Sequence, residues 1–231
     1  FEFEEIDFVN EKVLKFKKNN RWGLITPNNK TILNEKHQRI SIFANQYLKV
    51  ERANEVGFTE LKNFEFKKDN LKKVHTEFTF FDQRNFSITH QRYLKIRKNN
   101  RFGITTPTGK IILHPSAEKI VETPSGWAAY FKKEWRFYSF WGKQVFSNRL
   151  KDIKINSQNK SLTYAVRRDK KWAILDTQFR QKTGFSYDKI DFISHGAVLE
   201  NEHGKFLYLG KKEANNYISI EDYSKIDVFA F

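Results

Sequence analysis

Apolar and polar residues alternate in short runs along most of the chain, and turn-forming residues separate the runs. Residues 13–18 read VLKFKK and residues 94–98 read LKIRK. Offsets of two between apolar positions place the side chains on one face of a β-strand. The runs end at Asn19-Asn20, Asn99-Asn100 and His203-Gly204, which tolerate the positive φ of a tight hairpin. The pattern predicts an all-β chain of hairpins.

The hairpins belong to a repeat. Residues 18–33, KNNRWGLITPNNKTIL, return as residues 98–113, KNNRFGITTPTGKIIL, with ten of sixteen positions identical. With Trp22 as the anchor, six structural anchors follow one another: Trp22, Val56, Phe102, Trp135, Trp172 and Phe206. Apolar residues recur eight and six positions before each anchor, with Glu200 as the one exception. Eighteen positions after the anchor, four copies place Ile40, Ile120, Ile153 and Ile190.

This spacing predicts one repeat domain over residues 1–231, with residues 1–12 as an N-terminal capping strand. The repeats are placed at approximately residues 13–46, 47–92, 93–126, 127–162, 163–196 and 197–231, with an insertion at about residues 66–80. Each repeat is expected to form a hairpin and a third short strand near its isoleucine. The insertion is either a docking loop, for which its length argues, or a neutral addition, and its sequence also allows a short helix.

The stretches KNNRWGLITPNNKTIL and RDKKWAILDTQFRQKTGFSYDKIDFI resemble the WG repeats of bacterial β-repeat proteins. The resemblance covers essentially the whole chain and is most specific in the first, third and fifth copies. Elsewhere Val56 replaces the aromatic residue, and Arg136 and Leu207 replace the following glycine. The family implies an all-β array that binds or scaffolds, and it carries no catalytic residues to transfer.

The array is expected to be open, as an arc or superhelix, because the chain holds six hairpins and seven closing elements. Residues 1–9, FEFEEIDFV, match the closing element FSYDKIDFI, yet the sixth repeat ends in its own copy, DYSKIDVF. If the N-terminal piece closed a ring by completing the last repeat, the last repeat should lack its own closing element. The alternative is a closed six-bladed propeller-like ring in which each hairpin recruits the closing strand of the preceding unit.

Basic residues gather at the hairpin turns of a chain whose net charge is +15. Together with Trp141, which falls outside the repeat frame, they form the candidate partner-binding set: Lys17, Lys18, Arg21, Lys98, Arg101, Lys132, Lys133, Trp141, Arg167 and Arg168. One interpretation is a rim that binds polyanions. The other is that exposed turns simply tolerate lysine and asparagine. The aromatic anchors sit where the core requires them, which disfavours a platform for single-stranded nucleic acid.

The sequence predicts no catalytic residue, cofactor or metal site. Cysteine is absent, and six histidines occur singly, as expected of turn or surface residues. No phosphate-binding loop, nucleophile elbow or dinucleotide fingerprint appears, and no small-molecule substrate is indicated. No apolar run is long enough to form a transmembrane segment.

These observations favour a non-enzymatic interaction or scaffold module that binds another protein within a larger complex, as a subunit or accessory of a bacterial cell-envelope assembly. The alternative is a protein that binds nucleic acid or an anionic surface through its basic turns. A chain that begins at Phe1 without methionine suggests a secreted or periplasmic protein after signal removal, with a cytoplasmic location as the alternative.

Overall fold

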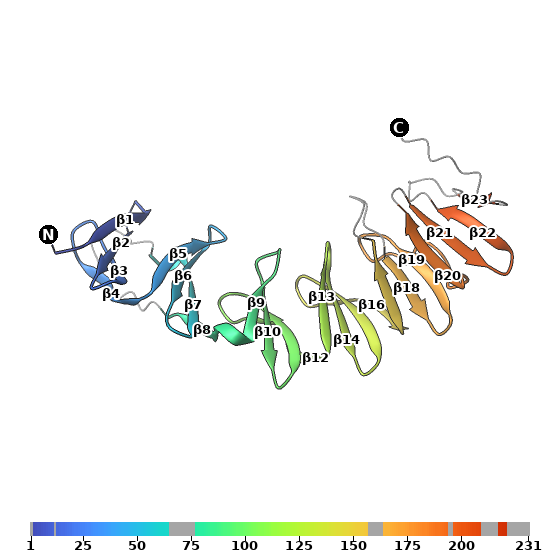
Figure 1. The fold of residues 1–231 in the computed structure, drawn as a ribbon, viewed down its shortest axis with the longest axis horizontal. Helices are drawn as coiled ribbons and strands as arrows, with labels where there is room; N and C mark the ends of the chain where they lie inside the picture. Colours follow the sequence, from blue (N-terminus) through green and yellow to red (C-terminus); the bar gives the residue numbers. More distant parts are fainter. Residues whose placement is uncertain are drawn as a thin grey trace. The chain divides into compact units, whose positions relative to one another are not determined.

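The computed structural model of the chain describes residues 2–11, 13–64, 77–156, 164–193, 196–208 and 217–220. Within these ranges the chain forms six antiparallel β-sheets (Figure 1). Two 3-10 turns, η1 (Leu61–Phe64) and η2 (Gln83–Asn85), interrupt the strands. The expected all-β class and its six hairpin-based units are therefore confirmed.

Each sheet is a meander whose strands follow chain order. Sheets 1 and 2 contain β1 (Glu5–Asn10), β2 (Val13–Lys18), β3 (Arg21–Ile25) and β4 (Thr31–His37), then β5 (Arg39–Phe43), β6 (Tyr47–Glu51), β7 (Glu55–Glu60) and β8 (Thr79–Asp82). Sheets 3 and 4 contain β9 (Phe86–Ile88), β10 (Leu94–Lys98), β11 (Arg101–Thr105) and β12 (Ile111–Ala117), then β13 (Lys119–Thr123), β14 (Gly126–Phe131), β15 (Glu134–Ser139) and β16 (Gln144–Leu150). Sheets 5 and 6 contain β17 (Asp152–Ile155), β18 (Tyr164–Arg168) and β19 (Lys171–Leu175), then β20 (Lys189–Ile193), β21 (Gly196–Asn201), β22 (Gly204–Tyr208) and β23 (Tyr217–Ile220).

The isoleucine strand of each repeat pairs with the hairpin that follows it. Ile40 lies on β5 opposite Val50 of β6, and Ile190 lies on β20 opposite Leu199 of β21. The sheets therefore begin one strand earlier than the repeats read from the sequence. At the N-terminus β1 fills the same place, because Ile6 pairs with Phe16 of β2. The choice between an open arc and a closed ring stays a prediction.

A fourth strand completes five of the six sheets, where the repeat pattern indicated three strands. This strand follows the anchor strand, as β4 follows β3, and shifts in register interrupt its pairing in sheets 1 and 4. In sheet 5 the segment takes the form of two isolated bridges, Trp172 with Tyr187 and Leu175 with Gln181. The Thr183 hydroxyl accepts the N–H of Ile174 at 2.8 Å between them. Irregular pairing leaves a weak alternating pattern, which explains why the sequence did not reveal the segment in sheets 1, 4 and 5.

Contacts divide the chain into two compact units, residues 1–116 and residues 117–231. In the first unit, the face of sheet 1 that carries Val13 and Leu24 packs against the face of sheet 2 that carries Ile40, Leu48 and Val50. The opposite face of sheet 2 packs on sheet 3 in the same manner. We call the face that meets the preceding sheet the leading face, and the face that carries the anchor residue the trailing face.

The second unit repeats this arrangement with a core rich in aromatic rings. Phe137 of sheet 4 lies 5.5 Å from Tyr164 of sheet 5 between ring centroids, and Phe179 stacks on Tyr164 at 5.2 Å. The trailing face of sheet 5, with Trp172 and Ile174, then covers the leading face of sheet 6. Aromatic burial on this scale supplies much of the stabilisation that a sheet pair needs.

Glycine follows the anchor because another group occupies the space of a side chain. A Cβ on Gly23 would lie 2.5 Å from the Phe16 ring, and one on Gly57 would lie 2.7 Å from the Phe80 ring. Both rings belong to the glycine's own sheet, as cross-strand partners. We expected from the sequence that an aromatic residue of a neighbouring repeat fills the space beside these glycines, and the structure shows instead an aromatic residue of the same repeat.

Candidate interaction surfaces

The hairpin turns have the backbone conformation that their residues predict. Asn19 and Asn20 adopt φ of 52° and 58°, and Asn99 and Asn100 adopt 49° and 59°. The fourth hairpin uses Lys132 and Lys133 in the same left-handed region, with φ of 45° and 70°. Lysine lacks the local hydrogen bonding that makes asparagine tolerant of this region. The double lysine is thus locally unfavourable.

Several members of the basic set are already engaged by the protein itself. Lys17 pairs with Glu5 at 2.6 Å, and Lys18 with Glu2 at 3.6 Å. Arg167 pairs with Asp152 at 3.5 Å and also lies over the Trp172 ring. Arg168 lies 4.5 Å from the centroid of the Phe185 ring. The charges of Lys17, Lys18 and Arg167 are therefore partly neutralised by the chain's own carboxylates.

The remaining members are exposed at turns. Arg21, Lys98, Lys132 and Lys133 make no ion pair within the part of the chain that the structure describes. Arg101 is exposed as well. In each unit the sheets stack with the same strand order, so we expect the equivalent turns of that unit to share one edge. The lysines of the insertion at residues 67, 68, 72 and 73 lie outside the described residues.

Four of the five aromatic anchors, Trp22, Phe102, Trp135 and Trp172, are each covered by a cation. Lys15 lies 5.0 Å from the Trp22 centroid and Lys95 lies 4.7 Å from that of Phe102. Lys119 and Lys154 take the same place over Trp135 and Trp172, at 5.8 and 5.0 Å. A ring that is packed on one side and covered by a cation on another offers little surface for base stacking.

The sixth repeat departs from the anchor register. In sheet 1 the anchor Trp22 pairs with Lys17 and its glycine with Phe16. In sheet 6 the position equivalent to Trp22 is Lys205, which pairs with Glu200, while Phe206 pairs with Leu199. The predicted anchor Phe206 is thus wrong by one residue. With Lys205 at the anchor position, the residue six positions earlier is the apolar Leu199, which explains why Glu200 broke the apolar pattern. The trailing face of the last sheet carries a lysine in place of the aromatic anchor.

Trp141 occupies the tip of a turn between β15 and β16 that is well held by hydrogen bonds. The Ser139 N–H donates to the Lys143 carbonyl at 2.8 Å, and the Lys143 N–H donates to the Ser139 hydroxyl oxygen at 3.2 Å. Gly142 supplies the positive φ of 83°. Phe140 packs against Trp127 at 5.4 Å, whereas the Trp141 side chain is 81% exposed. The same turn geometry recurs from Thr26 to Lys30, where Asn28 takes the place of Trp141.

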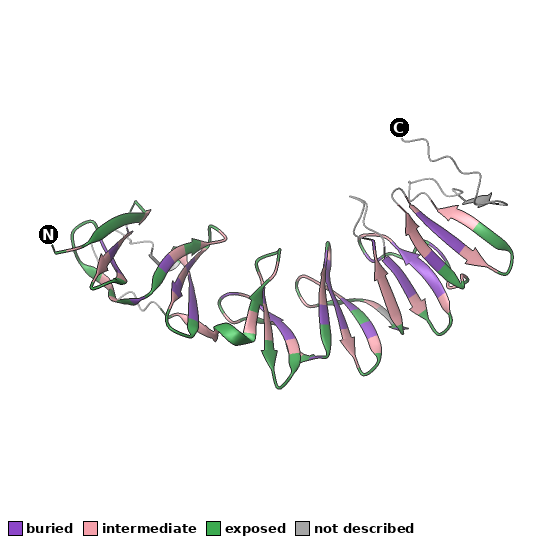
Figure 2. Ribbon diagram, viewed as in Figure 1, coloured by how far each residue is buried: buried purple, intermediate pink, exposed green. Residues whose placement is uncertain are grey.

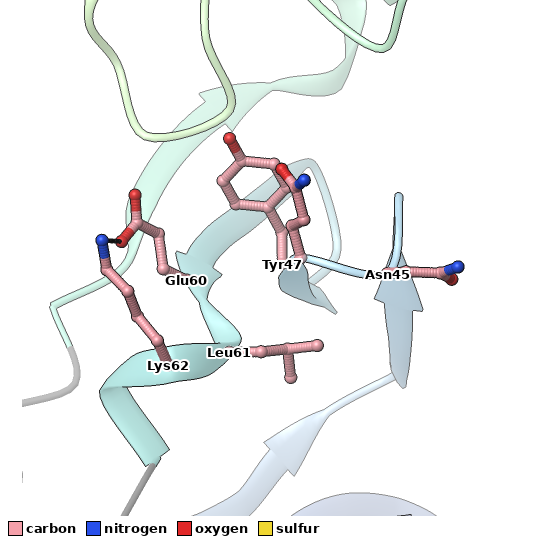
Figure 3. A pocket seen from close by; sticks show the side chains of 6 residues that line it. Asn45, Tyr47, Glu60, Leu61 and Lys62 are labelled. Atoms are coloured by element: carbon pink, nitrogen blue, oxygen red, sulfur yellow. Dashed lines mark ion pairs between the residues drawn. The ribbon is translucent and has the colours of Figure 1, made fainter.

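A small cavity of about 370 Å³ lies beside sheet 2, between the turn at Asn45 and the start of η1. Figure 3 shows the Tyr47, Glu60 and Lys62 side chains around it, with Glu60 paired to Lys62 at 2.5 Å. Burial and the Glu60 charge raise the pKa of Tyr47 above its usual value. No signal in the sequence pointed to this cavity. Its mixed polar lining favours no particular ligand.

The histidines are arranged differently from the expectation in one case. His37, predicted as a turn or surface residue, is buried at the end of β4, and burial lowers its pKa to about 4. The described residues contain no group of three His, Cys, Asp or Glu side chains able to hold a metal ion. His75 and His195 lie outside the described residues.

No protein-family model matches the chain, and no curated protein matches it. Solved structures similar to it include Hsv2 of Kluyveromyces lactis, at 9% identity over 91% of this chain and 74% of that chain, with a TM-score of 0.34. The Pan2 WD40 domain of Neurospora crassa has 9% identity over 93% of this chain and 76% of that chain, with a TM-score of 0.29. The dihydro-heme d1 dehydrogenase NirN has 8% identity over 89% of this chain and 53% of that chain, also with a TM-score of 0.29. Likenesses this low say nothing about function. Among the residues that the structure describes, no helix has the length and apolar character needed to cross a membrane.

Proposed function

We propose that the chain is a WG-repeat interaction module without enzymatic activity, which binds another protein as part of an exported, cell-envelope assembly. The observation that carries this proposal is Trp141, whose side chain is 81% exposed on a hydrogen-bonded turn. An indole in water offers a large apolar area, and tryptophan is enriched among residues that dominate binding energy. Because the turn is already ordered, this chain loses little conformational entropy when a partner covers the indole.

The test is capture of partners from the envelope fraction of the native organism, with washes at low and high salt and identification of the bound material. We expect a discrete protein that survives high salt and whose capture falls at least about tenfold with Trp141→Ala, as a lost hot spot should produce. Asn28→Ala, at the same position of the equivalent turn in sheet 1, is the matched control and should not change capture. Equal capture by both variants would refute the role of Trp141.

A second candidate function is polyanion binding through the hairpin turns. It is favoured by Lys98, Lys132 and Lys133, which are exposed and unpaired within the described part of the chain. Charge reversal at Lys98, Arg101, Lys132 and Arg168 should abolish such binding and leave a protein interface at Trp141 largely intact. Binding through phosphate contacts also weakens steeply as salt rises, because counterions are released. Heterogeneous anionic material that is lost at high salt would favour this second function over the first.

A further inference from the structure

The leading face of sheet 1 is apolar, and its residues on β1 are exposed to solvent, whereas Phe16 of β2 is buried. Ile6 is 54% exposed and Phe8 is 73% exposed, and both point to the same side of β1. Phe16 and Leu14 stand opposite them on β2, and the Phe3 ring lies 4.7 Å from the Phe16 ring. Figure 2 shows β1 exposed over most of its length, in contrast to the buried central strands of the other sheets. Large exposed apolar residues that lie together mark interaction surfaces.

The equivalent position is covered in other sheets. Ile40 of sheet 2 is 3% exposed because sheet 1 packs on it, and Ile190 of sheet 6 is fully buried against sheet 5. Ile42, two residues further on, stays 45% exposed, and Ile153 of sheet 5 is half-buried although sheet 4 packs on it. Ile6 is more exposed than any of these isoleucines. It occupies the equivalent position in sheet 1, and no sheet formed by the described residues packs on it.

The junction of sheets 5 and 6 shows what such a face recognises. Lys154, lying over the Trp172 ring, donates from Nζ to the Ile190 carbonyl at 2.6 Å. The same ammonium lies 3.6 Å from the Asp191 carboxylate, which also pairs with Lys189 of its own strand. The covering sheet therefore supplies an aromatic ring and a lysine. Sheet 6 supplies an isoleucine on its leading face, the carbonyl of that residue, and an aspartate of the same edge strand.

Sheet 1 carries the same elements. Asp7 follows Ile6 as Asp191 follows Ile190, and it pairs with one lysine of its own sheet, Lys15, at 2.9 Å. The Asp7 side chain is still mostly exposed. A second cation can approach it as Lys154 approaches Asp191.

We infer that the leading face of sheet 1, formed by Phe3, Ile6, Phe8, Leu14 and Phe16 with Asp7 at its edge, docks a further sheet of this repeat type carried by a partner polypeptide. The docking sheet presents an aromatic anchor covered by a lysine, as sheet 5 does toward sheet 6. This surface is separate from the Trp141 turn, and the inference stands if the proposed role of Trp141 fails.

The trailing face of sheet 6 in a second copy does not fit this description. It carries Lys205 at the anchor position. At the position of Lys154 it carries Asp191, which would meet Asp7 with like charge. The structure thus favours a different sheet over head-to-tail association of the chain with itself.

The test adds a surrogate docking sheet to the full chain. A copy of residues 152–188 is fused ahead of residue 2, and hydrogen exchange of the β1 amides is followed by mass spectrometry. We expect exchange at β1 to slow at least tenfold, and substitution of Phe8 by glutamate in the same fusion to restore it. The matched control is a fusion of equal length whose added copy carries Trp172→Lys and Lys154→Asp, the chemistry of sheet 6, which should leave β1 unprotected.

A second fusion guards against a copy that does not fold. It adds residues 5–38, which offer Trp22 and Lys15 from an independent sequence, and circular dichroism checks that β content rises with the added length. If neither fusion protects β1, or if the control fusion protects it equally, the inference is wrong. Concentration-dependent self-association of the unmodified chain that Phe8→Glu abolishes would show instead that a second copy occupies the face.

Discussion

The ammonium of Lys154 donates a hydrogen bond of 2.6 Å to the main-chain carbonyl of Ile190 and so joins sheet 5 to sheet 6. The lysine belongs to the first strand of one sheet and the isoleucine to the first strand of the next. The same ammonium lies 5.0 Å from the centroid of the Trp172 ring. One side chain thus connects equivalent strands of two successive sheets.

Lys154→Met should destabilise the chain, because the thioether keeps most of the apolar stem and loses the charged donor. We expect a loss of about 1–2 kcal/mol in the free energy of unfolding, as for a charge-assisted hydrogen bond to a carbonyl. Lys171→Met, which removes the surface pair with Asp188 at 2.8 Å, is the control and should cost less than about 1 kcal/mol. Urea unfolding measures both, and equal losses would contradict the special role of Lys154.

Replacing the double lysine of the fourth hairpin should stabilise the protein. Lys132 and Lys133 adopt left-handed backbone angles that asparagine and glycine occupy with less strain. Lys132→Asn with Lys133→Gly should raise the free energy of unfolding by about 1 kcal/mol, which is the scale of the left-handed penalty. Lys98→Asn, outside the left-handed pair of its own turn, should change little. A thermal melt that moves down for the double variant would refute the prediction.

Gly103→Ala should be costly, since the new methyl group would lie 2.6 Å from the Leu113 carbonyl oxygen and 2.7 Å from the Pro115 nitrogen. Both neighbours are backbone atoms and cannot rotate away. Overpacking of this kind costs about 1–3 kcal/mol. The nearest atom to a methyl group at Gly184 is the Ser186 hydroxyl at 3.5 Å, so Gly184→Ala is the control, expected to be neutral. Chemical denaturation of the two variants distinguishes a filled space from a general intolerance of alanine.

The buried His37 should make the protein less stable in mild acid. Burial lowers its pKa from 6.5 to about 4, and the charges of Arg52 and Lys36 act in the same direction. As the pH falls, His37 of the unfolded chain therefore binds a proton near pH 6.5, whereas His37 of the folded chain binds it only near pH 4. Above pH 6.5 His37 does not affect the free energy of unfolding. As the pH is lowered from 6.5 to about 4, the free energy of unfolding falls by up to about 3 kcal/mol.

His37→Leu should remove most of this loss when unfolding is compared at neutral pH and near pH 5. His114→Gln replaces an exposed histidine and should retain the slope of the unmodified chain. If His37→Leu keeps the full acid dependence, other groups are responsible for it.

Local patterns in the sequence were sufficient for the hairpin strands and their turns, though not for the fourth strand of the sheets. Alternation with a period of two, broken by Asn19-Asn20 and Asn99-Asn100, predicts hairpins because the side-chain period and the turn geometry are properties of a few consecutive residues. The same locality identified Trp141 as a residue outside the core frame, and the structure places it in water. The basic turns were also visible, but their ion pairs with Glu5 and Asp152 were not.

Pairing between distant segments was decided by three-dimensional packing. The sequence of the isoleucine strand does not say whether it pairs with the hairpin before it or with the hairpin after it. Only the assembled sheets show that Ile40 pairs with Val50 of the following hairpin. In the sixth repeat, the sequence fits two registers equally well, because Val198 and its neighbour Leu199 are both apolar. Only the pairing across the hairpin shows that Lys205, not Phe206, occupies the anchor position. His37 is buried because its position in β4 lies opposite Trp22, a relation that no neighbour in sequence encodes. Sequence patterns report local geometry, whereas register and burial depend on which sheets meet.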